Sequence, residues 1–297
     1  MKSYWPLVAS LSLAISAQAS TRIATEDAPG ISDADYVNYA ANFPSVGKLN
    51  GAFSGSGVLI SSQWVLTAGH VADFSNSMTF TIGDHVVGSS EIIVHPDYQS
   101  YSSNHAYDLA LVRLETAIGD INPAQLWEFS SPDGVLGREG SWVGYGQGGD
   151  GLTGAQGATY ALRGFTNMIE YTGDEIGVTA DAFVADFDRP DGSENFNEKS
   201  DPFPTALEGQ LTPFDSGGGV FTQIGDFDYL IGINSFRGVT DGSFNSDYGD
   251  LSGAINLQPF IDWIETTTGV MAVPEPGHFA AIAALAMLGI VAWRRRR

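Results

Sequence analysis

Short runs of apolar and β-branched residues, separated by turns rich in glycine, asparagine and serine, fill the middle of the chain. Runs of this length and spacing are typical of antiparallel β-structure. We expect eight strands in particular, at residues 57–60, 64–69, 78–83, 91–95, 109–114, 141–146, 218–224 and 229–236. The polar residues 225–228 should join the last two of these strands as a hairpin.

A helical pattern follows these strands. Apolar residues recur at the i, i+3, i+4 and i+7 positions that form one face of a helix, namely Leu257, Phe260, Ile261 and Ile264. Asn256 can cap the start of this helix, and Pro259 falls in its first turn, where a missing N–H costs little. The pattern predicts a helix that closes the domain.

Residues 181–201 are polar and acidic, and they predict a long surface loop. Several of their side chains carry oxygen atoms of the kind that a calcium ion binds: Asp186, Asp188, Asp191, Asn195 and Glu198. The spacing of the three aspartates is one residue too long for an EF-hand loop. A solvated acidic loop is therefore the alternative to a calcium site.

Both ends of the chain differ from this middle. Lys2, an apolar stretch over residues 5–15 and the small-residue pattern at residues 17–19 predict a signal peptide over residues 1–19. An apolar segment followed by four arginines closes the chain, and such arginines favour a cytoplasmic C-terminus. We therefore expect a folded domain over residues 20–269, a linker over 270–277, a transmembrane helix over 278–293 and a cytoplasmic tail over 294–297.

The part between the signal peptide and the linker is long enough for one all-β domain with a sizeable core. With the two ends set aside, eight basic residues face 34 acidic ones. Such a surface repels nucleic acid and anionic membranes and favours a soluble monomer. The chain has no cysteine, so an exported protein of this sequence must depend on core packing or bound ions instead of disulfides.

Three short motifs carry candidate catalytic residues. "WVLTAGHVAD" places His70 at the end of an apolar strand, "AYDLALVRL" places Asp108 before another, and "PFDSGGGVF" places Ser216 on a glycine-rich turn. Acyl transfer by serine needs a base to take the hydroxyl proton and a buried carboxylate to orient that base. The order differs from that of α/β-hydrolases, whose G-x-S-x-G motif is also excluded by Phe214.

From about Ile23 to Ile264 the chain resembles a trypsin-like serine protease of the chymotrypsin fold, since "SGSGVLISSQWVLTAGH", "VGYG" and "FIDWI" also fall in the family's order. The resemblance implies two antiparallel six-stranded β-barrels with the site between them. It implies that His70 is the general base, Asp108 its orienting carboxylate and Ser216 the nucleophile. Protein or peptide substrates are expected, and no cofactor is required for the chemistry. Three further histidines match no catalytic motif and are interpreted as surface or loop residues: His85, His95 and His105.

The chain also departs from the family's pattern around the expected site. The family's oxyanion hole uses the backbone N–H groups at the positions of Phe214 and Ser216, and Phe214 replaces a glycine. A side chain there either strains the turn or turns the peptide away, so we expect reduced activity. The resemblance places four residues at the specificity pocket, namely Gln210, Ser235, Phe236 and Arg237. Arg237 could narrow this pocket or attract an acidic group of the substrate.

The C-terminal 25 residues resemble a PEP-CTERM sorting signal, with Pro274-Glu275-Pro276, an apolar helix and terminal arginines. This resemblance implies a Gram-negative bacterium, an inner-membrane precursor, recognition by an exosortase-type enzyme and release to the outer surface or an extracellular matrix. A permanent membrane anchor is the alternative.

The leading hypothesis is thus an exported serine endopeptidase that works through an acyl-enzyme. The alternative is a catalytically silent protein that keeps the protease fold as a surface or matrix component. Near the predicted signal cleavage site, "TRIATEDAP" resembles the family's activation site. Cleavage after Arg22 would free an ammonium group on Ile23 that could pair with Asp215.

Overall fold

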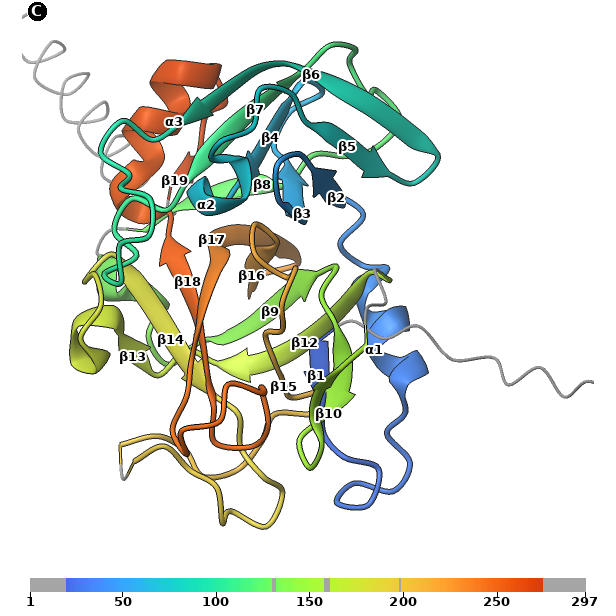
Figure 1. Ribbon diagram of the computed structural model, residues 1–297, viewed down its shortest axis with the longest axis vertical. Coiled ribbons are helices and arrows are strands. Elements are labelled where there is room, and N and C mark those ends of the chain that lie inside the picture. Colours follow the sequence, from blue (N-terminus) through green and yellow to red (C-terminus); the bar gives the residue numbers. More distant parts are fainter. Residues whose placement is uncertain (1–19, 130–131, 158–160, 198, 275–297) are drawn as a thin grey trace, which may run out of the picture.

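The first β-unit is a closed barrel in the computed structural model, which describes residues 20–129, 132–157, 161–197 and 199–274 (Figure 1). Its six antiparallel strands follow one another in the order β2 (Val46–Asn50), β3 (Ser54–Leu59), β4 (Trp64–Thr67), β7 (Ala110–Leu114), β6 (His85–Val94) and β5 (Thr79–Ile82). Leu59, Leu66, Phe80 and Leu111 lie wholly buried among the apolar residues of this barrel. The first of the two expected barrels is therefore confirmed.

The second β-unit is an open sheet, which lies below the barrel in Figure 1. Its strands run in the order β12 (Arg163–Met168), β9 (Glu139–Gly144), β16 (Gly219–Ile224), β17 (Phe227–Gly238), β18 (Leu251–Asn256), β14 (Ala182–Asp186) and β13 (Tyr171–Thr172). Strand β8 (Gln125–Glu128) pairs with β17, and β19 (Val273–Pro274) pairs with β8. The prediction of a second closed six-stranded barrel is wrong, because this unit is only a half-barrel.

Hydrogen bonds from the Asn167 side chain take the place of a backbone ladder that would have closed this sheet. Asn167 on β12 donates hydrogen bonds from Nδ2 to the carbonyl oxygens of Asp186, at 2.5 Å, and Gly209, at 3.3 Å. Strand β14 ends at Asp186, so β12 meets β14 only through such contacts. The buried amide keeps the backbone groups at this seam satisfied without a strand pair.

A small third sheet brings the first described residues beside the second unit. It contains β11 (Gly154–Gln156), β10 (Gly148–Asp150), β1 (Ser20–Arg22) and β15 (Gly209–Gln210), in that order. Helix α1 (Asp33–Ala40) follows β1, and Asp35 and Ser32 form its capping box. Helix α1 was not predicted from the sequence, and only Tyr36 and Ala40 of its side chains are buried.

The remaining helical segments are short and lie at the ends of strands. They are α2 (Gly69–Ala72), the 3-10 turns η1 (Pro132–Val135), η2 (Gly173–Ile176) and η3 (Gln258–Phe260), and α3 (Ile261–Thr268). The predicted closing helix is confirmed as η3 and α3, which pack on the flank of the barrel through Phe260, Ile261 and Ile264 (Figure 1). The N-cap position of this segment is Leu257, not Asn256, although Asn256 Oδ1 still accepts a hydrogen bond from the Gln258 N–H at 3.1 Å.

All eight predicted strands and the hairpin are present, although β6 begins six residues before its predicted start at residue 91. The expected surface loop at residues 181–201 begins with the buried strand β14, whose apolar residues pack between β13 and β18. His95 lies in the loop just after β6, as expected, but its ring is buried against Tyr107 and Trp263 and does not lie at the surface.

The predicted signal peptide, transmembrane helix and arginine tail lie outside the described residues. The first part of the predicted linker is described, and there Val273 and Pro274 form β19 beside β8. Across the described ranges, no helix is long and apolar enough to cross a membrane.

Candidate active site

Strand pairing in the barrel brings His70 and Asp108 together. Thr67 at the end of β4 lies opposite Ala110 at the start of β7, so the residues just beyond these two positions become neighbours. His70 lies in α2, immediately after β4, and Asp108 lies two residues before β7. Asp108 Oδ2 is 2.8 Å from His70 Nδ1, and Asp108 Oδ1 accepts the His70 backbone N–H at 2.8 Å.

This pair is electrostatically asymmetric. Asp108 is buried, with 1% of its surface exposed, whereas the His70 side chain keeps 39% exposed. Burial disfavours the charged imidazole, but the charge and hydrogen bond of Asp108 outweigh it and raise the pKa of His70 above 6.5. Burial would likewise raise the pKa of Asp108, yet its contacts with His70 and Ser235 lower it overall. The arrangement holds an anionic carboxylate behind an accessible imidazole.

Ser216 lies on a turn that Ser56 of the barrel holds in place. The Ser56 N–H donates to the Ser216 carbonyl oxygen at 2.8 Å, and Ser56 Oγ donates to the Phe214 carbonyl oxygen at 3.0 Å. Gly217 has a φ of +84°, and a Cβ there would lie 2.2 Å from the Ser56 carbonyl oxygen, so this position requires glycine. Ser216 and His70 line the same cavity, without a direct side-chain hydrogen bond in the described part of the chain.

Phe214 adopts a conformation that is rare for residues with a side chain. Its φ is +79°, inside the left-handed region that favours glycine. The turn therefore keeps the backbone geometry of a glycine even though a phenylalanine occupies the position. Of the two outcomes expected from the sequence, strain and a turned-away peptide, the structure shows the strained backbone.

Asp215, between Phe214 and Ser216, is buried with four hydrogen bonds. Its carboxylate accepts the Gly146 N–H at 2.8 Å, the Thr212 N–H at 2.9 Å, Thr212 Oγ1 at 2.8 Å and Ser20 Oγ at 3.1 Å. Burial nevertheless raises the pKa of Asp215 to about 6. The first described residue of the chain thus contacts the carboxylate that adjoins the candidate nucleophile.

Ile23, the residue expected near Asp215 after cleavage, lies in a separate small core. Its side chain is 2% exposed in a small core with Phe187 and Tyr248, and its N–H donates to the Tyr36 hydroxyl at 3.2 Å. In the uncleaved chain, Ser20 contacts Asp215, so pairing of Ile23 with Asp215 after cleavage behind Arg22 would require Ile23 to leave this core.

A cavity of about 550 Å³ surrounds His70 and Ser216. Most of its wall is aromatic or apolar, as in many sites that bind organic ligands. The remaining lining residues are Phe53, Ser54, Val71, Asp73, Phe74, Tyr98, Ser100, Tyr101, Ser102, His105, Asp108, Leu211, Thr212, Pro213, Phe214, Ser235, Phe236, Arg237 and Phe244. The three predicted catalytic residues therefore share one cavity wall.

Three of the four predicted pocket residues line this cavity, and Gln210 does not. Gln210 is wholly buried, and its Oε1 accepts a hydrogen bond from Ser252 Oγ, because an amide inside the core needs a polar partner. Its neighbour Leu211 lines the cavity instead. Ser235 lies behind His70, where its Oγ donates to Asp108 Oδ2 at 2.5 Å.

His105 is a cavity residue that the sequence analysis assigned to the surface or a loop. It lines the same cavity as His70, and its ring stacks on Phe236 with centroids 4.6 Å apart. Burial lowers the pKa of His105, which favours a neutral ring at neutral pH. No motif in the sequence identified it, because the contact depends on a loop of the barrel meeting β17 of the other unit.

Arg237 lies at the end of β17 with its guanidinium held over Phe244. The carbon Cζ is 4.2 Å from the centroid of that ring, and NH1 donates to Ser246 Oγ at 2.8 Å. Burial lowers the pKa of Arg237, while the charges of Asp215 and Asp250 act in the opposite direction. The side chain is thus a fixed cation on the cavity wall.

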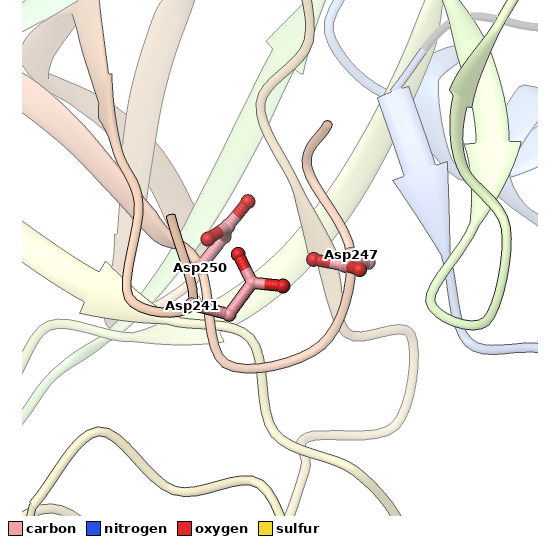
Figure 2. Close-up of side chains that lie close together, drawn as sticks. All are labelled: Asp241, Asp247 and Asp250. Atoms are coloured by element: carbon pink, nitrogen blue, oxygen red, sulfur yellow. The ribbon is translucent and has the colours of Figure 1, made fainter. Parts of the chain in front are cut away.

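A cluster of carboxylates lies in the loop that carries Phe244 and Ser246. One oxygen each of Asp241, Asp247 and Asp250 lies within 4.8 Å of the others. Figure 2 shows the three side chains in this loop. Three carboxylates are fewer than the six to eight oxygen ligands of calcium, so carbonyl groups and water would have to complete a site. Asp250 already accepts the N–H groups of Thr240 and Ser246.

The calcium ligands predicted within residues 181–201 are only partly gathered, because Asp186 and Asn195 both accept a hydrogen bond from Ser200 Oγ whereas Asp191 is bonded within its own turn. Asp186 accepts the Phe196 N–H at 2.8 Å, Asp191 accepts the Ser193 N–H at 2.9 Å, and Asn195 contacts Ser200. Glu198 lies outside the described residues. Within the described ranges, no group that includes Asp186 or Asp188 meets the geometry found for the cluster of Figure 2.

Comparison with known proteins identifies the family. The sequence profile of the Trypsin family matches residues 37–192, which include His70 and Asp108 and end before Ser216. Chymotrypsin-like elastase family member 1 of Homo sapiens is 33% identical over 95 residues, which cover 29% of this chain and 34% of that protein. Its relative from Rattus norvegicus is 37% identical over 82 residues, which cover 24% and 30%. The matched region thus spans about a third of the length of these relatives.

A solved structure of HL collagenase supports the fold alone. It superimposes with a TM-score of 0.58 at 22% identity, covering 77% of this chain and 94% of that one. The Trypsin profile covers more than half of the chain, and the closed barrel and the half-barrel agree with this fold. The protein therefore belongs to the trypsin family of serine endopeptidases.

Proposed function

We propose that this protein is a serine endopeptidase that hydrolyses peptide bonds through an acyl-enzyme. The observation that carries the proposal is the pair of 2.8 Å contacts between His70 and buried Asp108, in one cavity with Ser216. A histidine oriented by a buried carboxylate beside a serine on a tight turn is the arrangement that acyl transfer by serine needs. The elastase relatives support this class of activity.

In the proposed reaction, Ser216 Oγ attacks the carbonyl carbon of the scissile bond while His70 takes the hydroxyl proton. Asp108 keeps the proton of His70 on Nδ1 and stabilises the imidazolium that forms. The N–H groups of Phe214 and Ser216 stabilise the oxyanion. His70 then gives its proton to the leaving amine, the amine departs, and a water molecule activated by His70 releases the acyl group from Ser216.

The second candidate function is a catalytically silent binding protein on the cell surface or in the extracellular matrix. The strained backbone of Phe214 favours it, since a bulky residue stands at the turn that should bind the oxyanion. The two functions differ in whether Ser216 reacts. Peptide hydrolysis by the purified domain separates them.

Hydrolysis of a mixed peptide library by the protein should depend on Ser216 and on a neutral His70. We expect Ser216→Ala to abolish turnover above background and Asp108→Asn to lower kcat by about 10⁴-fold. Because Asp108 raises the pKa of His70, kcat/KM should rise with pH through a value above 6.5. Turnover that survives Ser216→Ala would contradict the proposed function.

Phe214→Gly should raise kcat. The positive φ of Phe214 in the structure costs about 1–3 kcal/mol, so this turn competes with a relaxed turn in which the N–H points away from the oxyanion. Glycine removes the strain and thus the competing turn. Recovery of one oxyanion donor corresponds to about ten- to several-hundred-fold in kcat, with KM changed little. Phe214→Ala should gain less, because alanine keeps the Cβ that penalises this backbone conformation.

Phe74→Gly is the matched control for this prediction. Phe74 also lines the cavity and also has a positive φ, +59°, but it lies next to α2 and away from the Ser216 turn. Its substitution relieves a similar strain without changing the oxyanion turn. Equal gains in both variants, or no gain in Phe214→Gly, would refute the role assigned to Phe214.

We also propose that signal cleavage after Ala19 gives the mature protein an N-terminus at Ser20. Ser20 would then carry a free ammonium group, and its Oγ is 3.1 Å from the Asp215 carboxylate. The positive charge of this ammonium would compensate the negative charge of the buried carboxylate. Edman sequencing of the active protein should start at Ser20. A form extended by Gly-Ser should lose up to about 3–5 kcal/mol of unfolding free energy and part of its activity. An N-terminus at Ile23 would overturn this assignment.

The sorting signal at the C-terminus completes the proposal. We infer that the protein is exported as an inner-membrane precursor, and that an exosortase-type enzyme releases it to the outer surface or matrix. The inference is based on Pro274-Glu275-Pro276 and the apolar segment that follows. Replacement of these three residues by alanine should leave the protein in the inner-membrane fraction. Release equal to that of the parent would mean that the tail has another function.

A further inference from the structure

The catalytic cavity holds a cation that the chemistry of acyl transfer does not require. Arg237 is the lone arginine or lysine among the described residues that line it. The part of the chain between the signal peptide and the linker has only eight basic residues against 34 acidic ones. A cation fixed on the wall of the cavity that also contains the candidate nucleophile, in so acidic a protein, points to an interaction with a molecule that enters the cavity.

Arg237 has no ion pair within the described ranges, in contrast to three other cations of the protein. Arg163, Arg189 and Lys199 each have a carboxylate within ion-pair distance. Among the described residues, no carboxylate oxygen lies within 4.0 Å of the Arg237 guanidinium, whose contacts are Ser246 Oγ and the ring of Phe244. A hydroxyl and an aromatic ring orient the guanidinium but leave most of its N–H donors without a charged acceptor.

The carboxylates near Arg237 accept hydrogen bonds from other donors. Asp215 accepts hydrogen bonds from Gly146, Thr212 and Ser20. Asp250 accepts those of Thr240 and Ser246, and Asp108 behind the cavity is held by His70. Asp73 lines the cavity but contacts Ser100. These groups face Arg237 at longer range, so an anion that enters the cavity can still approach its guanidinium directly.

The surroundings of Arg237 would strengthen such an approach. The ring of Phe244 lies against the guanidinium, and Phe236 and Leu211 add further apolar wall to the same cavity. Apolar walls exclude water, and the attraction between opposite charges grows as the local dielectric constant falls. The planar guanidinium also matches the two oxygens of a carboxylate, which favours a bidentate contact.

We propose that Arg237 selects peptide substrates with an aspartate or glutamate side chain beside the scissile bond. The proposal rests on the proposed peptidase function and names its substrate class. Arg237 acts through contact with the substrate and takes no part in bond breaking. A structural role, in which Arg237 only fixes the loop of Phe244 and Ser246, would change stability without distinguishing a charged side chain from its neutral analogue.

A matched pair of substrates tests this directly. Internally quenched peptides of the form Ala-Ala-X-Ala-Ala, with X either Glu or Gln, differ in charge alone, and mass spectrometry gives the bond that is cleaved. One charge-assisted hydrogen bond corresponds to about 10- to 100-fold in kcat/KM, so the wild type should prefer Glu by that factor. The preference should shrink at high salt because ions screen the pair.

Three variants complete the test. Arg237→Gln should abolish the preference by slowing the Glu peptide, while Arg237→Lys, which keeps the charge, should retain part of it. Arg113→Gln is the control, because Arg113 lies on the barrel over Trp64 and outside the cavity. It should keep the wild-type preference.

A binding measurement separates this inference from the peptidase function. The Ser216→Ala variant should bind the Glu peptide about 10-fold more tightly than the Gln peptide in calorimetry, and Ser216→Ala/Arg237→Gln should bind both equally. If the protein binds the Glu peptide more tightly but the wild type shows no turnover, the peptidase proposal is contradicted and the role of Arg237 is supported. Turnover or binding that is equal for both peptides, or a preference unchanged in Arg237→Gln, would overturn the inference.

Discussion

The buried carboxylate of Asp215 joins the segments on which the candidate site depends. It accepts hydrogen bonds from the loop after β9, from Thr212 before the turn and from Ser20 at the start of β1. A buried charge is stable only when it is fully hydrogen-bonded or paired, so these segments are held around it together. The turn that presents Ser216 therefore depends on the N-terminal strand, although 196 positions separate the two serines.

Ser56 and Asn234 extend this connection to both β-units. Ser56 on β3 binds the backbone of Phe214 and Ser216, and the Gly217 N–H donates to the Asn234 carbonyl oxygen at 2.8 Å. The barrel itself contributes His70 and Asp108 through the pairing of β4 with β7. The candidate site thus lies where the two units meet, and the strained φ of Phe214 is maintained because its carbonyl is anchored from the barrel.

Local sequence patterns predicted the strands well, and they also selected His70, Asp108 and Ser216, which line one cavity, because both kinds of pattern depend on residues close together in the chain. The closing helix followed from apolar spacing for the same reason. What the sequence could not show were contacts between distant segments. These include the side-chain seam at Asn167, the burial of Gln210 against Ser252, the stacking of His105 on Phe236 and the approach of Ser20 to Asp215. The predicted loop at residues 181–201 failed where acidic residues at the end of β14 concealed a short buried strand.

The most direct test of the account is whether Ser216 is a nucleophile. A fluorophosphonate probe reacts with a serine only where a base and an oxyanion site activate it, and peptide mapping by mass spectrometry identifies the modified residue. The account predicts labelling of Ser216 in the purified protein that rises with pH and falls sharply in Asp108→Asn. A folded protein in which Ser216 takes no label at any pH between about 6 and 9 would contradict it.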